Sequence, residues 1–337
     1  VTLAAGNTYK LSGEYIVEEG ATLHIEEGVK IIAVYDDIAD YILVKQGGKI
    51  NAVGTPDKPI VMTSEKEEPG AWGGIHICGR AHTNAEGGKG SSEIGGAVYG
   101  GNDDADNSGT LQYIRLEYTG FAFDEEHEAN GISFYGVGNG TIVDHCQAYK
   151  GSDDGFEFFG GSVNVSNLVA VSCSDDSFDW TEGWNGKGTN LVAYQEAEST
   201  LGYDCDCLME CDNNGSNNAA TPVAHPVLKN LILVGNGGSK QGIRLRAGTE
   251  VEIDNAKVCG KGQPLTVETA LTENALKNGT SKLTNITLTS ELSSKEGIYT
   301  HADFIAVTSN KVDANLSYSS FEDIRKECSW MNGSWVK

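Results

Sequence analysis

Proline, basic side chains and long apolar runs are scarce in this sequence. Only 6 of the 337 residues are proline, and 24 lysines and arginines face 48 aspartates and glutamates, which leaves a formal net charge of −24. This charge repels phosphate, and no cluster of basic residues offsets it, so we expect no nucleic-acid partner. No apolar run approaches the roughly 18 residues that a membrane-spanning helix needs, so we expect no membrane-spanning segment.

A leader segment is also missing from the sequence. The chain begins with Val1 rather than methionine, and neither a basic stretch nor an apolar stretch precedes the first β-like run. We interpret the sequence as a mature chain from which a signal peptide has been removed. Its acidity, its many glycines and asparagines and its few lysines are typical of exported bacterial proteins, so we expect an extracellular or cell-surface location.

Glycine, by contrast, is abundant, with 43 residues, which is roughly twice its usual share. It does not recur at every third position, which excludes a collagen-like triple helix, and the apolar residues form ordered runs, which excludes disorder. A glycine-rich, β-rich and helix-poor chain of this length is typical of one elongated solenoid. We therefore expect a single solenoid over residues 1–337 rather than two domains.

An internal repeat of about 22 residues supports this expectation. Residues 148–158 and 170–180 share alanine, serine, two aspartates and phenylalanine at equal spacing, and residues 167–170 recur as 190–193. The β-branched triplets of the repeat are separated by polar residues, and the leucine scaffold of a leucine-rich repeat is absent. The pattern predicts a parallel β-helix, in which like residues of successive coils stack about 4.8 Å apart.

Three segments resemble a known family. Residues 54–64 (GTPDKPIVMTS), 72–77 (WGGIHI) and 152–157 (SDDGFE) are similar to segments of a widespread bacterial family of exported β-helix surface proteins. The resemblance covers most of residues 20–250. It implies an all-β fold, namely a right-handed single-stranded parallel β-helix like that of pectate lyases, and an exported location, but it implies no particular reaction.

Two regions depart from the regular coils. Residues 86–109 form a glycine- and aspartate-rich insertion that we expect to protrude from the solenoid, where binding residues are common. Residues 262–337 are less regular and contain helical patterns at 266–278 and 319–328, the second of which opens with the spacing of a capping box. We expect the last helix to cap or flank the solenoid.

A ladder of carboxylates is the first candidate site. If 22 residues make one coil, Asp154 and Asp176 lie about 5 Å apart. Like charges at that distance raise each other's pKa unless they share a proton or a cation, and Ca²⁺ accepts six to eight oxygen ligands. The alternative is that the acids face solvent at a turn and bind backbone N–H groups. The candidate ligands are Asp153, Asp154, Glu157, Asp175, Asp176 and Asp179.

Aromatic side chains adjoin these acids in the sequence. Aromatic faces beside carboxylates are typical of a sugar-binding groove, whereas stacking in the core is the alternative. We favour core stacking for Phe156 and Phe178 and expect the other aromatic residues to bind sugar. These sugar-binding candidates are Phe158, Phe159, Trp180 and Trp184.

A second candidate cation site lies at the end of the insertion. Asp104, Asp106 and Ser108 have the spacing of the first ligands of a calcium-binding loop. The twelfth position of that loop is Arg115 rather than glutamate, and a β-like run follows instead of a helix, which excludes an EF-hand. We expect either a truncated calcium loop or a polar loop of the insertion.

The eight cysteines allow disulfides but do not prove them. Cys205, Cys207 and Cys211 lie within seven residues, and with a distant histidine such a set can bind Zn²⁺. Their spacing is not a common zinc pattern, so we favour a disulfide involving one of them in an exported chain. Isolated cysteines such as Cys78 and Cys146 are expected to be buried apolar residues.

The pattern for catalysis is incomplete. Polygalacturonases, which share the implied fold, use aspartates, a histidine in a glycine-rich motif and a late Arg-x-Lys pair. This chain has paired aspartates at Asp154 and Asp176 and a similar late pair at Arg244 and Arg246, but it lacks a Gly-His-Gly motif. An arginine that serves as the base of a calcium-dependent lyase must share a face with the acids. About three coils, or roughly 15 Å, separate the two sets, which weakens this hypothesis.

We therefore favour an exported or cell-surface protein that contacts polysaccharide with bound Ca²⁺ and has no proven catalytic centre. A polysaccharide lyase or glycoside hydrolase that acts on an acidic glycan is the first alternative, and a structural, adhesin-like stalk is the second. The net charge of −24 disfavours a metal-free enzyme for uronate polymers, because its groove would repel them.

Overall fold

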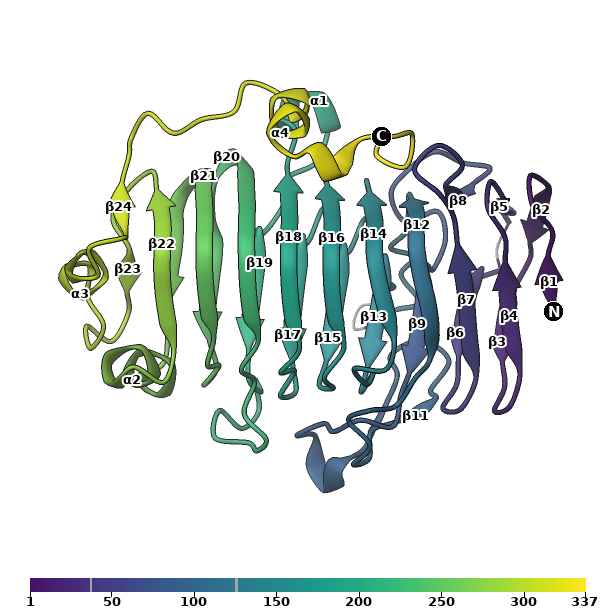
Figure 1. Cartoon of the computed structure of the whole chain (residues 1–337), viewed down its shortest axis with the longest axis horizontal. Coiled ribbons are helices and arrows are strands. Elements are labelled where there is room, and N and C mark those ends of the chain that lie inside the picture. The colour runs from purple at the N-terminus through teal and green to yellow at the C-terminus, as the bar shows by residue number, and fades with distance from the viewer. Residues whose placement is uncertain (37, 125–126) are drawn as a thin grey trace.

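The chain winds into a right-handed parallel β-helix, as predicted. The computed structural model describes residues 1–36, 38–124 and 127–337, and Figure 1 shows the coils stacked side by side along the long axis of the molecule. Every ladder between successive coils is parallel, so each coil uses the backbone of the coil before it as a template.

The strands form three stacks. Stack 1 begins with β1 (Thr2–Leu3), β4 (Thr22–Ile25) and β7 (Lys49–Val53). Stack 2 begins with β2 (Thr8–Leu11), β5 (Lys30–Ala33) and β8 (Ile60–Ser64). Stack 3 consists of β3 (Glu14–Val17), β6 (Tyr41–Val44), β9 (Ile75–Cys78), β13 (Ile132–Tyr135), β15 (Phe156–Phe159), β17 (Phe178–Thr181), β19 (Met209–Asp212), the ends of two longer strands named below, and β23 (Ser293–Ser294).

Farther along the chain, stacks 1 and 2 are spanned by single long strands. The first of them, β12, pairs with both β7 and β8. These strands are β12 (Gly109–Glu117), β14 (Ile142–Tyr149), β16 (Asn164–Val171), β18 (Lys187–Tyr194), β20 (Val227–Arg246), β21 (Glu252–Val267), β22 (Lys282–Leu288) and the short β24 (Lys311–Val312). The last parts of β20 and β21 also enter stack 3.

Each long strand bends where one residue adopts a positive φ. Asn167, Asn190, Asn230 and Asn255 have φ between 55° and 63°, a conformation that asparagine tolerates better than most residues. Their side-chain amides hydrogen-bond to one another from coil to coil at 2.8–3.0 Å. His145 lies at the same corner, opposite Asn167, with φ of 53°.

The predicted register of the repeat is confirmed in stack 3. Phe156 lies opposite Phe178, and Glu157 lies opposite Asp179. Because side chains alternate along a strand, the phenylalanines point inward, where their rings stack at 5.6 Å, and the acids point outward.

The aromatic residues expected to bind sugar are buried. Trp180 and Trp184 are each 1% exposed and Phe158 is 2% exposed, and the rings of Phe158 and Trp184 stack at 4.1 Å in the interior. Phe159 points outward, but it is covered and stacks on Tyr135 at 4.4 Å. A ring without exposed surface has no face to offer to a sugar, so this prediction is wrong and the core alternative holds.

The insertion folds back onto stack 3 instead of standing free. After η1 (Glu86–Gly88), the short strands β10 (Gly90–Ser91) and β11 (Val98–Tyr99) pair antiparallel. Ile94 and Tyr99 then pack in a buried cluster with residues of β6, β9, β13 and β15. The insertion therefore covers the outer face of stack 3 over its N-terminal coils.

Helices lie outside the coils. α1 (Glu198–Leu201) is part of a loop, and α2 (Ala270–Asn278) and α3 (His301–Ala306) lie at the C-terminal end of the solenoid (Figure 1). The helix expected over 266–278 begins four residues later, because β21 continues to Val267. In the described part of the chain, no helix is both long enough and apolar enough to cross a membrane.

The last residues form a segment that we call the C-terminal strap, residues 313–337. It contains α4 (Phe321–Glu327) and η2 (Ser329–Met331) and runs back along the side of the solenoid toward β8, as Figure 1 shows. Ile324 and Trp335 of the strap pack with outward-facing valines and isoleucine of β16, β18 and β20. The last helix therefore flanks the solenoid, which was one of the two expected arrangements.

Candidate functional site

Nine positions on the outer side of three successive coils, three of them buried, form an acidic cluster that we call the carboxylate grid. Each coil supplies two adjacent residues from the turn before its stack 3 strand and one residue from the strand itself. The rows are Asp153, Asp154 and Glu157; Asp175, Asp176 and Asp179; and Asp206, Cys207 and Glu210.

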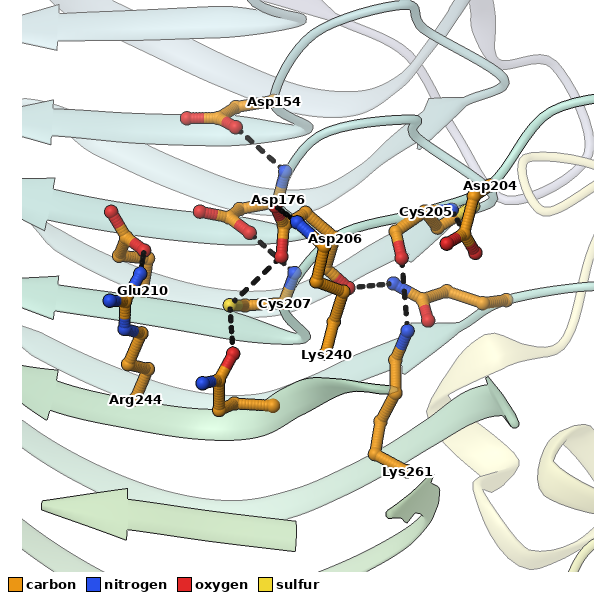
Figure 2. A network of polar contacts seen from close by, with 12 residues as sticks. Asp154, Asp176, Asp204, Cys205, Asp206, Cys207, Glu210, Lys240, Arg244 and Lys261 are labelled. Atoms are coloured by element: carbon orange, nitrogen blue, oxygen red, sulfur yellow. Dashed lines mark hydrogen bonds and ion pairs between the residues drawn. The ribbon is translucent and has the colours of Figure 1, made fainter. Parts of the chain in front are cut away.

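Hydrogen bonds between coils set the register of the grid. Glu157, Asp179 and Glu210 lie opposite one another in the strand ladder. At the turn, Asp154 Oδ1 accepts the backbone N–H of Asp176 at 2.8 Å, and Asp176 Oδ1 accepts the backbone N–H of Cys207 at 2.6 Å. One oxygen of each aspartate therefore accepts a backbone N–H (Figure 2), as the turn alternative predicted, but both aspartates are buried rather than solvent-facing. The other oxygen of each is left for further interactions.

The two ends of the grid differ in charge. On the N-terminal side, Asn130 Nδ2 donates to Glu157 Oε2 at 2.6 Å. On the C-terminal side, β20 supplies a basic row that pairs with the third row of the grid: Lys240 contacts Asp206 at 2.5 Å, and Arg244 contacts Glu210 at 3.0 Å. The basic row neutralises only the third row.

The six carboxylates of the first two rows have no ion-pair partner among the described residues. Burial raises the pKa of the Asp153 carboxyl to about 7, and repulsion by Asp175 contributes. Burial likewise raises the pKa of Glu157 well above its usual value, and Asp179 raises it further. Asp179 Oδ1 is buried and accepts no hydrogen bond. These carboxyls need bound protons or a bound cation to be stable together.

The side chains of the grid converge closely enough to share cations. In four overlapping groups, one ligand atom from each of three residues lies within 4.8 Å of the other two. Hard oxygens in such numbers suit Ca²⁺, which fills its remaining positions with water or ligand oxygens. The groups are Asp153, Asp154 and Asp175; Asp154, Glu157 and Asp179; Asp176, Asp179 and Glu210; and Asp176, Asp206 and Cys207.

The two aspartates of the expected calcium loop form hydrogen bonds with backbone N–H groups and with a histidine ring. Asp104 Oδ1 accepts the ring Nδ1 of His82 at 2.7 Å and its backbone N–H at 3.1 Å. Asp106 Oδ2 accepts the backbone N–H of Arg80 at 2.8 Å, and Ser108 is buried. These contacts tie the end of the insertion to the coil after β9, so the structure favours the polar-loop alternative over a truncated calcium loop.

Arg244 and Arg246 lie on the same outer face as the acids and nearer to them than expected. Arg244 is opposite Glu210, which is itself opposite Asp179, so two strand steps or about 10 Å separate Arg244 from the second row. Both guanidinium groups are engaged, because Arg244 also pairs with Glu268 and Arg246 pairs with Glu210 and Asp212. The acids beside Arg246, Asp212 first among them, raise its pKa.

The cysteines form no disulfide, and all eight are buried. The favoured disulfide that involves one of Cys205, Cys207 and Cys211 is therefore wrong. Cys211 points into the core opposite Trp180, whereas Cys207 points outward into the grid. Cys207 lies in the turn before β19 and Cys211 lies within that strand, and the group that contains Cys207 has two aspartates rather than further cysteines or a histidine.

Cys207 and Arg244 were singled out in the sequence for other roles. The rows that continue the grid through Asp206 and Glu210 to Lys240 were missed. Their signal is nevertheless present, because the pattern Asp-Asp-x-x-acid of the first two rows continues as Asp-Cys-x-x-Glu from Asp206 and as Lys-Gln-x-x-Arg from Lys240. Loops lengthen the spacing between these rows from 22 residues to 31 and then 34, so a search at a fixed period does not find them.

Comparison with known proteins agrees with this architecture. The family model described as a pectate-lyase-like beta helix domain matches residues 1–336. Neither a curated protein nor a solved structure matches the chain. Because the family model spans nearly the whole sequence and the strands form the parallel stacks of such a domain, the chain belongs to the family of pectate-lyase-like β-helix domains.

Proposed function

We propose that this chain is an extracellular or cell-surface β-helix protein that binds an acidic polysaccharide through Ca²⁺ held on the carboxylate grid. The observation that carries the proposal is the set of six uncompensated carboxylates arranged in groups whose ligand atoms lie within 4.8 Å. The group of Asp154, Glu157 and Asp179 is the proposed calcium site, because all its ligands are hard oxygens and Asp179 Oδ1 has no other partner.

A cation also resolves the electrostatic conflict between this protein and an acidic glycan. The chain carries a formal net charge of −24, so a polyanion approaching the bare grid is repelled. Three protein oxygens leave at least half of the coordination positions of Ca²⁺ open, and a glycan carboxylate or hydroxyl can occupy them. The family of pectate-lyase-like domains supports polysaccharide as the class of ligand.

Binding is favoured over catalysis by the state of the two arginines beside the grid. The base of a lyase must be free to take a proton, and Arg244 and Arg246 are both held in ion pairs. The enzymatic alternative is therefore left as an outcome of the test.

Calorimetric titration of the protein with Ca²⁺, and then with a panel of uronate and neutral glycans, tests the proposal. We expect Ca²⁺ to bind, and an acidic glycan to bind only when Ca²⁺ is present. The double variant Glu157→Gln/Asp179→Asn should weaken Ca²⁺ binding roughly tenfold or more, which corresponds to about 1.4 kcal/mol or more of binding free energy. It should keep the fold, because it removes repulsion between the two carboxylates.

Glu27→Gln is the matched control, since Glu27 is an exposed acid that pairs with Lys58 far from the grid. It should bind Ca²⁺ and glycan like the native chain. Absence of Ca²⁺ binding, or binding of an acidic glycan that a chelator leaves unchanged, would contradict the proposal. Cleavage or an unsaturated product in the same mixtures would favour the lyase or hydrolase, and no glycan binding at all would favour the structural stalk.

A further inference from the structure

A cavity of about 300 Å³ lies between the row of stacked asparagines at the bend of the long strands and the C-terminal strap. The asparagine amides form one wall, the strap forms the other, and apolar side chains on the outside of β18 and β20 form the floor. Such a mixture of apolar surface with a few polar groups is typical of small-ligand sites, and the volume is at the lower end of their range. The lining residues that matter here are Asn190, Asn230, Asn255, Val192, Ile232 and Trp330.

Trp330 offers the aromatic surface that the buried tryptophans cannot. The other four tryptophans of the chain are at most 1% exposed, whereas Trp330 is only partly buried. Its ring packs against Trp335 and His145, with centroids 6.2 Å and 6.4 Å away, and it also borders the cavity. Packing therefore holds the indole in place, and its electron-rich face can stack against the C–H groups of a sugar ring.

The amides of the opposite wall have hydrogen-bonding capacity to spare. A side-chain amide has two N–H donors and an oxygen with two lone pairs. The contacts from coil to coil take one N–H and one lone pair of Asn190 and the same of Asn230. No other group in the described part of the chain takes the remainder, so each amide can still donate one hydrogen bond and accept one. Neighbouring sugar hydroxyls, which both donate and accept, match this pairing.

The charged side chains at the cavity neutralise each other. Lys257 forms an ion pair with Glu327 Oε1, and the hydroxyl of Tyr318 donates to Glu327 Oε2 at 2.8 Å. A charged ligand has to break this pair, whereas a neutral ligand leaves it intact. The cavity therefore favours a neutral molecule that has several hydroxyl groups and an apolar face.

We propose that this cavity binds a neutral sugar unit of a polysaccharide. Trp330 stacks on one face of the sugar ring, and Asn190 and Asn230 form hydrogen bonds with its adjacent hydroxyls. The site needs no cation and shares no residue with the carboxylate grid, so it does not depend on the calcium proposal. It gives the protein a second contact with carbohydrate, of opposite charge preference to the first.

Calorimetric titration in the presence of a chelator tests this site. The neutral probes are tetrasaccharides of glucose, xylose, mannose, galactose and N-acetylglucosamine, and tetragalacturonate is the acidic probe. We expect at least one neutral probe to bind with a stoichiometry of one, and tetragalacturonate not to bind. Trp330→Leu should weaken binding roughly tenfold or more, because leucine keeps apolar contacts in the strap but has no aromatic face.

Asn230→Gly provides a second test, because glycine keeps the positive φ of 59° at no steric cost and removes only the amide. It should also weaken binding roughly tenfold, the loss expected for a hydrogen bond or two, and it decides the matter if circular dichroism shows that Trp330→Leu does not fold. Asn285→Gly is the matched control, since Asn285 lies at the same bend with φ of 54° but bonds to Asp254 instead of joining the asparagine row.

Asn285→Gly should bind the neutral probe like the native chain. Glu157→Gln/Asp179→Asn should do the same, so failure of the calcium proposal is distinguishable from failure of this one. Three results would overturn the proposal: no binding of any neutral probe, tighter binding of tetragalacturonate than of every neutral probe in chelator, or native affinity in folded Trp330→Leu or Asn230→Gly.

Discussion

At the scale of single residues, burial governs the chemistry of the grid. An aspartate at a solvent-exposed turn is ionised at neutral pH and needs no partner. Asp154 and Asp176 are only 6% and 4% exposed, and burial together with neighbouring acids raises the pKa of both carboxyls well above the usual range. The same residue types on a more open coil would be simple solvated charges.

The pH dependence of stability follows from these shifts. A carboxyl whose pKa is higher in the folded state stabilises the fold most when protonated, and this stability falls as pH rises from its unfolded pKa to its folded pKa. For Asp153 this range runs from its ordinary value of 3.8 to about 7. Without a cation, the grid should therefore make the protein less stable as pH rises through this range.

We expect Ca²⁺ to raise the melting temperature more at pH 8 than at pH 5, because at pH 5 the cation must displace protons. At a concentration 100 times its Kd, Ca²⁺ should add about 2.7 kcal/mol at the higher pH. Calorimetric melting with Ca²⁺ or chelator at both values measures this. Asp153→Asn/Asp175→Asn should flatten the pH dependence in chelator, and an equal Ca²⁺ effect at both pH values would contradict the interpretation.

At the scale of elements, the asparagine corner holds the long strands in their bent form. Asn190 donates to Asn167 Oδ1 at 2.8 Å and accepts from Asn230 Nδ2 at 3.0 Å while its own φ is 60°. The side chain thus serves two purposes, since it links three coils and it tolerates a left-handed backbone.

Substitution of Asn190 can separate these two effects. Asn190→Gly loses two hydrogen bonds, at about 1 kcal/mol each, but keeps the backbone conformation at no steric cost. Asn190→Ala loses the same bonds and also incurs roughly 1–2 kcal/mol for a left-handed residue with a Cβ. Denaturant midpoints should therefore fall in the order native, glycine, alanine. Equal midpoints for the two variants would show that backbone strain contributes nothing.

At the scale of the whole molecule, the C-terminal strap joins parts of the chain that are more than 200 residues apart. Arg115 Nη1 donates to Ser334 O at 2.7 Å, and Lys337 pairs with Glu117 at 3.1 Å. Trp335 is fully buried between these contacts and its ring packs edge-on against Tyr113 and His145. The strap covers apolar side chains on the outside of the strands that would otherwise face water.

Trp335→Ala should therefore destabilise the protein by about 3–5 kcal/mol, the usual loss for a large buried aromatic residue. It should also increase binding of a hydrophobic dye, because a loosened strap exposes the valines beneath it. Trp330→Ala is the comparison, since Trp330 is only partly buried in the same cluster and its loss should cost less. Chemical denaturation followed by fluorescence measures both variants, and equal losses would contradict this account of the strap.

The sequence predicted the coils and the first two rows of the grid for local reasons. Strand alternation and a 22-residue period are properties of short segments, and they place Phe156 on Phe178 and Glu157 on Asp179 without knowledge of the rest of the fold. The sugar-binding prediction failed because the same alternation was not applied to Phe158 and Trp180, which share the inward face with the phenylalanines before them.

By itself, then, the sequence determined the β-helix, its register over the regular repeats and the presence of a cluster of acids. The tertiary structure alone decided which charges meet. Loops of unequal length bring Glu210 and Arg244 into line with Asp179, and the folded-back insertion and strap bury side chains that a regular coil would expose. Contacts of this kind depend on how segments that are far apart in the sequence stack in space, and no local pattern of residues encodes that arrangement.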